Sequence, residues 1–169
     1  MHMLVTGDQI GHGASTVCST LQGLNKPAFD SDFIEGLAGW LDLNNHATVT
    51  IAGSQSPDIR KFGKFWSETV LQDLLSTHKN LVLCGEADNQ LNYYRWFDGV
   101  IVLDIPPHEQ ARHLHSRAEH DYDNNPELVE LIIRKRAQLL SASRSLGATI
   151  MNANRPVRDV SNDIIRHLK

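Results

Sequence analysis

The fold is decided by the stretch Met3-Leu4-Val5-Thr6-Gly7-Asp8-Gln9-Ile10-Gly11-His12-Gly13-Ala14-Ser15-Thr16. An apolar strand enters a glycine-rich loop, and a helix with Val17, Leu21 and Leu24 on one face follows it. Glycines let backbone N–H groups turn inward around an anion, and the start of the helix adds its own unpaired N–H groups. The order of strand, loop and helix therefore predicts a phosphate-binding turn. The alternative is an ordinary glycine-rich connection without a ligand.

The loop departs from the standard pattern G-x-x-x-x-G-K-[ST] at two positions. The first glycine falls on Asp8 and the lysine on Ala14. An acidic group is thus added near the expected phosphates, and the usual cation is missing. Lys61 and Lys64 are candidates to supply that charge from another helix.

The loop nevertheless supplies a set of candidate ligands for a nucleotide. A hydroxyl at Ser15 or Thr16 would lie where Mg²⁺ is usually held, and Ser15 is the expected metal ligand. The expected nucleotide-binding residues are Gly11, His12, Gly13, Ala14, Ser15 and Thr16.

Composition limits the class of protein. The chain has 169 residues, 41% of them hydrophobic, which suits one globular domain with a substantial core. The net charge of −4 gives no global basic field for nucleic acid, so any anion site must be local. Cys18 and Cys84 are distant in the sequence and lie in apolar surroundings, which favours buried thiols in a reducing compartment. Without a long apolar run or a leader, we expect a cytoplasmic protein that is a monomer or a homodimer.

Strands and helices alternate along the rest of the chain. Continuous apolar runs predict strands covered on both faces at 80–85 and 99–105, and shorter strands are expected at 26–29 and 148–152. Residues 48–51 are expected to form a short strand or an extended loop. Apolar residues at helical spacing predict helices over 32–43, 59–75, 106–119, 126–145 and from 156 to the end. This alternation predicts an α/β fold, a three-layer arrangement around a five-stranded parallel sheet.

Ligands of such sheets bind beyond the carboxyl ends of the strands. The glycine loop, the pair Asp30 and Asp32, and Gly85-Glu86 each follow a strand, so all should meet at that edge. Asp30 and Asp32 would bind Mg²⁺ through water or contact the acceptor. The alternative for Asp32 is a helix N-cap.

The chain resembles the P-loop nucleoside monophosphate kinase-like family, and within it the compact archaeal-type cytidylate kinases. The resemblance is carried by four segments, Gly11–Thr16, Phe29–Ile34, Val82–Gly85 and Phe97–Leu103, and by the final strand and helix. It departs from the family at Glu86 and at His113, where arginines are expected. The resemblance implies a single domain over 1–169 with a small lid at about 117–136.

The resemblance also implies arginines that close over the transferring phosphate. Arg117 precedes a polar, lid-like segment, and Arg134 and Arg136 fall on the helix where the family carries its lid-exit arginines. Guanidinium groups match phosphate oxygens in geometry. The alternative for each arginine is a solvated helix face.

The expected activity is that of a transferase that uses ATP and Mg²⁺ to phosphorylate a small molecule, most directly a nucleoside monophosphate. Asp30-x-Asp32 would equally suit a hydroxyl acceptor of the shikimate or nucleoside type. A non-catalytic nucleotide-binding protein is the third possibility. No nucleic-acid or membrane partner is expected.

Overall fold

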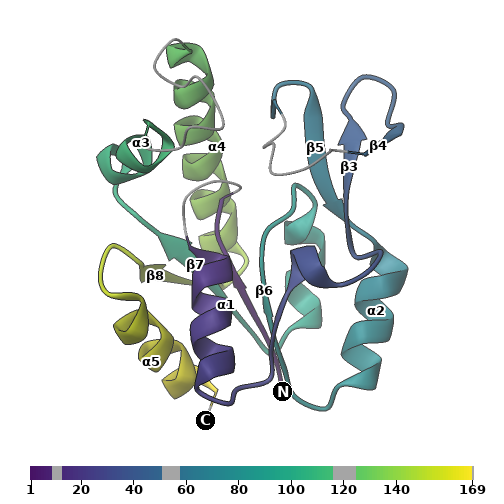
Figure 1. The fold of residues 1–169 in the computed structure, drawn as a ribbon, viewed down its shortest axis with the longest axis vertical. Helices are drawn as coiled ribbons and strands as arrows, with labels where there is room; N and C mark the ends of the chain where they lie inside the picture. Colours follow the sequence, from purple (N-terminus) through teal and green to yellow (C-terminus); the bar gives the residue numbers. More distant parts are fainter. Residues whose placement is uncertain (9–12, 51–57, 116–124, 169) are drawn as a thin grey trace.

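The computed structural model describes residues 1–8, 13–50, 58–115 and 125–168. Its centre is a five-stranded, all-parallel sheet in the order β2-β6-β1-β7-β8 (Figure 1). The strands are β1 His2–Thr6, β2 Ala28–Asp30, β6 Leu81–Cys84, β7 Gly99–Asp104 and β8 Thr149–Asn152. The predicted parallel α/β sheet is confirmed.

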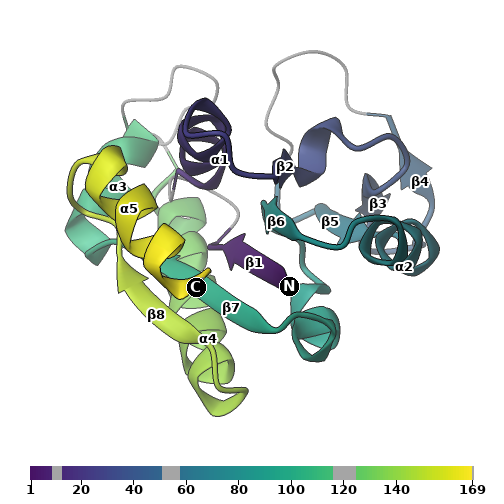
Figure 2. The same ribbon diagram turned by 90° about the horizontal axis from the view of Figure 1, so that it is seen from below.

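Helices cover both faces of this sheet (Figure 2). On one face α1 (Ala14–Gly23) and α5 (Val157–His167) pack against Val5, Val82 and Ile101. On the other face α2 (Glu68–Thr77), the 3₁₀ segment η2 (Gln90–Trp96) and α4 (Pro126–Ser145) pack against Leu4 and Leu83. Neighbouring residues of β1 and β6 thus face opposite layers, as a sheet buried on both sides requires.

The helix predicted at 126–145 is confirmed as α4, which begins with Pro126 in its first turn. α3 (Pro107–His115) confirms the start of the helix predicted at 106–119, and its expected continuation past 115 falls outside the described residues. Of the lid expected at about 117–136, the described part is Asn125 and the first half of α4.

The helix predicted at 32–43 is wrong, and so is the first part of the helix predicted at 59–75, whose later residues do fall in α2. The two wrongly predicted segments form a second sheet. Residues 38–42 and 62–66 are strands β3 Ala38–Asp42 and β5 Phe62–Trp66, which pair antiparallel, with β4 Thr48–Val49 on the outer side. Figure 1 shows this sheet standing beyond the upper end of β6. It therefore lies on the side where the parallel strands end.

Each error has a local physical reason. After the short turn η1 (Ser31–Phe33), Gly36 has a left-handed φ of 74°, so a helix over 32–43 cannot continue through it. In the second segment the helix starts only at Glu68, because the Ser67 hydroxyl accepts a hydrogen bond from Val70 N and caps α2 there.

Candidate active site

The carboxyl edge of the parallel sheet collects the predicted site elements. Asp30 at the end of β2 is in register with Cys84, and Cys84 is in register with Val5, which precedes the glycine loop. Neighbouring strands lie about 4.8 Å apart, so Asp30 is roughly 10 Å from the strand that feeds the loop. A side chain at that distance from the loop can face the terminal phosphate of a nucleotide that the loop binds.

The described end of the loop has the geometry of an anion site. Gly13 precedes α1 with φ 76°, and no side chain caps the helix among the residues that the structure describes. Ser15 and Thr16 are exposed in its first turn, whereas Ala14 is buried. An uncapped first turn with two exposed hydroxyl residues fits a bound phosphate and a cation beside it. Gly11 and His12 lie outside the described residues.

Asp8 is held by a neighbour. Its carboxylate accepts a hydrogen bond of 3.2 Å from the Gln110 side-chain amide on α3. It also borders a cavity of about 270 Å³ together with Asp88, Gln90 and Lys135. The acidic group that departs from the standard loop is thus on the wall of a cavity beside the site.

The two aspartates after β2 have different surroundings. Asp30 is buried, and its carboxylate accepts a hydrogen bond of 3.0 Å from Asp32 N. The alternative expectation, that Asp32 is the cap, is wrong, because Asp30 caps the short turn η1. Asp32 is half exposed at the site edge, where its carboxylate pairs with Lys64.

Lys64 is the centre of a cluster of charged side chains that was not predicted from the sequence. It projects from β5, is 5% exposed, and pairs with both Asp32 and Glu86, the latter at 3.2 Å. Burial by itself would lower the pKa of Lys64, but the two carboxylates outweigh it and the pKa lies above the usual lysine value. Lys64 is therefore charged at neutral pH and is committed to these two carboxylates.

Glu86 is the least solvated acid of this cluster. Burial raises its pKa to about 7, although the Lys64 ammonium opposes that shift. Near neutral pH this side chain exchanges a proton at the site edge. The sequence placed Glu86 at this edge and marked it as a departure from the expected arginine, but indicated no pairing with Lys64.

The predicted arginines fall into three situations. Arg136 is buried and pairs with Asp104 at the end of β7. Arg134, two residues earlier on α4, is exposed. Arg117 lies outside the described residues. Among the predicted cations, Lys61 is exposed on the turn before β5.

Cys18 of α1 and Cys84 of β6 are both buried, as expected, and their thiols are neighbours in one core cluster. This contact and burial raise the pKa of Cys84. The thiol pair packs the helix that follows the loop against the strand that leads to Gly85.

Neither a protein-family model nor a curated protein matches this sequence. Solved structures do match it over nearly its whole length. A shikimate kinase from Bacteroides thetaiotaomicron is 18% identical, with a TM-score of 0.60 over 99% of this chain and 97% of that one. A shikimate kinase from Acinetobacter baumannii in complex with shikimate is 16% identical, with a TM-score of 0.61 over 99% and 92%.

A gluconokinase from Sinorhizobium meliloti is more distant, at 12% identity and a TM-score of 0.52 over 99% of this chain and 90% of that one. At these identities the likeness concerns the fold. The chain has the three-layer fold of the P-loop small-molecule kinases. Within the part of the chain that the structure describes, no helix is long and apolar enough to cross a membrane.

Proposed function

We propose that this protein is an ATP-dependent kinase that phosphorylates a hydroxyl group of a small acceptor. The observation that carries the proposal is the group of acidic side chains around Lys64, at the sheet edge beside the glycine loop. The fold supports kinase activity in general. The charge of this group of side chains indicates which kind of acceptor the site would bind.

The nucleotide would be held by the loop and the first turn of α1. Backbone N–H groups from Gly13 to Thr16 would bind its phosphates, and the Ser15 hydroxyl would hold Mg²⁺. A bound Mg²⁺ would neutralise charge on the phosphate oxygens. Because position 14 is an alanine and not a lysine, the affinity for the phosphates would come from these amides and from the N-terminus of α1.

The acceptor would lie beside Asp32. In the transfer, the acceptor oxygen forms a bond to the γ-phosphorus, the bond between that phosphorus and the β–γ bridging oxygen breaks, and ADP leaves. The hydroxyl proton passes to the half-exposed Asp32 carboxylate, and Asp30 holds the Asp32 backbone in place.

The sheet edge around Asp32 and Lys64 is called the acceptor edge below. Its charge favours an acceptor that carries no phosphate of its own. Four carboxylates and two ammonium groups gather there in the described structure: Asp30, Asp32, Glu86 and Asp88, with Lys64 and Lys135. A second phosphate would meet a net negative surface, which costs free energy unless cations outnumber the acids. A neutral polyol or sugar-like alcohol, or a cationic amino alcohol, fits this surface better.

A nucleoside monophosphate is the second candidate acceptor, as the resemblance to cytidylate kinases implies. The observation that favours it is Lys64 itself, a buried ammonium at the acceptor edge. That ammonium is already shared by two carboxylates, so a phosphate would have to displace at least one of them.

The test is an ADP-release assay against a panel of polyols, sugars, cyclic alcohols, amino alcohols, nucleosides and nucleoside monophosphates. Asp32→Asn should lower turnover of an accepted alcohol about a hundredfold or more, because the proton acceptor is lost. Asp73→Asn on the exposed face of α2 is the matched control and should leave turnover unchanged. Turnover of monophosphates alone would favour the second candidate, and nucleotide binding without any turnover would favour a non-catalytic protein.

A further inference from the structure

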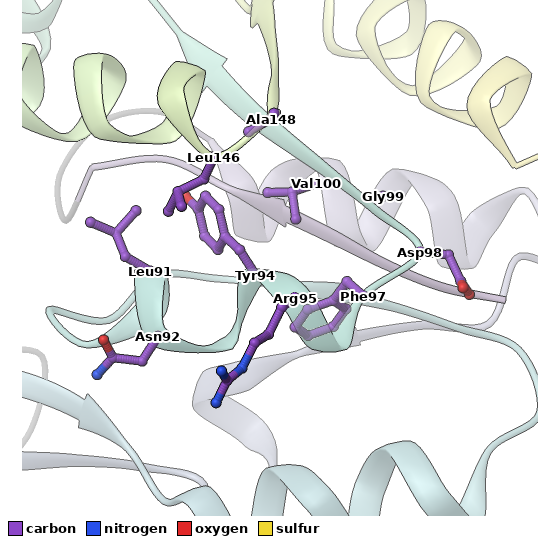
Figure 3. A pocket seen from close by; sticks show the side chains of 11 residues that line it. Leu91, Asn92, Tyr94, Arg95, Phe97, Asp98, Gly99, Val100, Leu146 and Ala148 are labelled. Carbon is purple, nitrogen blue, oxygen red and sulfur yellow. The ribbon is translucent and has the colours of Figure 1, made fainter.

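A second cavity lies at the opposite edge of the parallel sheet, where its strands begin. It measures about 610 Å³ and is bordered by η2, by the start of β7 and by the turn between α4 and β8 (Figure 3). β1 and β7 run about five residues, or roughly 17 Å, between this edge and the glycine loop. A molecule in this cavity would therefore not touch the residues of the candidate active site.

The wall of the cavity combines an apolar part with a polar rim. Its apolar residues are Leu91 and Tyr94 of η2, Val100 of β7, and Leu146 and Ala148 from the turn after α4 (Figure 3). Leu146, the residue that follows α4, is 57% exposed. The Tyr94 hydroxyl is already bonded to Ser143 at 3.0 Å, and Tyr94 is 5% exposed, so only a small part of its ring borders the cavity.

The rim carries three polar side chains, Asn92, Arg95 and Asp98. Asp98 is engaged, because its carboxylate accepts a hydrogen bond of 2.7 Å from His2 N. Arg95 is exposed, and within the described residues its guanidinium makes no hydrogen bond or ion pair. The rim thus offers one uncommitted cation next to an apolar wall.

We propose that this cavity binds a small organic anion with a flat apolar body, the anionic group pairing with Arg95 and the body lying against Tyr94 and Leu146. The volume falls in the usual range for ligand sites, and an apolar wall with a few polar groups is their usual composition. A guanidinium fork pairs with a carboxylate or sulfonate through two parallel hydrogen bonds. The proposal is independent of the kinase activity, since it concerns the other edge of the sheet.

The probe for this site is 1-anilinonaphthalene-8-sulfonate, which has an aromatic body and one anionic group and fluoresces when it is bound. The wild-type protein should bind one probe molecule per chain in a saturable titration. Arg95→Gln should weaken binding about tenfold, because one charge-assisted pair is lost. Arg158→Gln removes the same charge from the exposed face of α5 and should leave the affinity unchanged.

Ala148→Phe fills the cavity from its wall and should abolish saturable binding. Melting temperatures of all variants establish whether they are folded. If Ala148→Phe does not fold, the comparison of Arg95→Gln with Arg158→Gln tests the proposal without it. Excess MgATP should leave the bound probe in place. The proposal is overturned if the probe does not saturate, if Arg95→Gln and Arg158→Gln bind it equally well, or if MgATP displaces it.

Discussion

Gly85 approaches Ser31 so closely that neither position has room for a larger side chain. A Cβ placed on Gly85 would lie 2.9 Å from the Cβ of Ser31 and closer still to its Oγ, and Gly85 has φ 141°. Ser31 is fully buried at the start of η1. The end of β6 and the turn that carries Asp32 are thus held against each other, and this contact sets the spacing of the acceptor edge.

We expect Gly85→Ala to lower the free energy of unfolding by about 2–4 kcal/mol, from the steric overlap and the strained φ together. Ser31→Gly alone should cost about 1 kcal/mol. In the double variant the overlap is relieved, so the loss should be smaller than the sum of the two single losses. Denaturant unfolding of the four proteins measures this, and strictly additive losses would contradict the contact.

Gly13 and Gly23 are a matched pair at the two ends of α1. Among the residues that the structure describes, a Cβ at either position would meet nothing within 4 Å, but of the two only Gly13 has a left-handed φ, at 76°. Gly13→Ala should therefore destabilise the protein by about 1 kcal/mol, whereas Gly23→Ala should stabilise it by about 0.5 kcal/mol through helix propensity. Opposite shifts in the denaturation midpoint are expected. Shifts of the same sign would show that the turn before α1 is not held in this conformation.

The raised pKa of Glu86, about 7, gives the stability a specific pH dependence. The native state holds a proton that the unfolded state releases from about pH 4.5 upward. This group's contribution is therefore largest in acid and is lost as the pH rises through about 7. From about pH 5 to about pH 8 the free energy of unfolding should fall by roughly 2–3 kcal/mol on account of Glu86.

Glu86→Gln should flatten that fall, because the amide does not titrate. Glu35→Gln, at an exposed position, should keep the wild-type slope. Unfolding experiments at a series of pH values compare the three proteins. A wild-type slope in Glu86→Gln would mean that Glu86 is ionised throughout the range.

Substitutions of Arg136 and Arg134 should have different effects, the first on stability and the second on activity. Arg136→Met leaves Asp104 without its partner in a largely buried position and should cost about 2–4 kcal/mol of stability. Arg134→Met removes an exposed cation and should change stability by less than about 0.5 kcal/mol. If Arg134 closes over the phosphate as the resemblance implies, turnover falls in Arg134→Met although the protein is fully stable. Unchanged turnover would leave Arg134 as a solvated residue.

The parallel sheet could be predicted because its strands carry their own signals. Residues 81–84 and 99–104 are continuous apolar runs, and strands buried on both faces need such runs. The helix α4 likewise combines a helical apolar period with Pro126 in its first turn. These signals are local, so one sequence is sufficient to recognise them.

The second sheet could not be predicted in the same way. Apolar residues at 59, 62, 66, 70 and 74 match a helical period by coincidence, while Phe62–Trp66 pairs with Ala38–Asp42. The aromatic residues of 62–66 and the cap at Ser67 were the available signals for a strand followed by a later helix. Because β5 was missed, Lys64 could not be placed between Asp32 and Glu86, and the cluster that defines the acceptor edge was missed with it.

The proposed kinase activity requires that the turn before α1 bind the phosphates of MgATP without a lysine. Isothermal titration calorimetry of MgATP against the wild type, Ser15→Ala and Ser19→Ala tests it most directly. Ser19 is exposed one turn further along α1, and its hydroxyl bonds to Ser15 O, so its loss is the matched control. We predict saturable binding of one nucleotide per chain, weakened about tenfold or more and made insensitive to Mg²⁺ in Ser15→Ala, and unchanged in Ser19→Ala. Absence of binding by the wild type, or equal binding by all three proteins, would contradict the account.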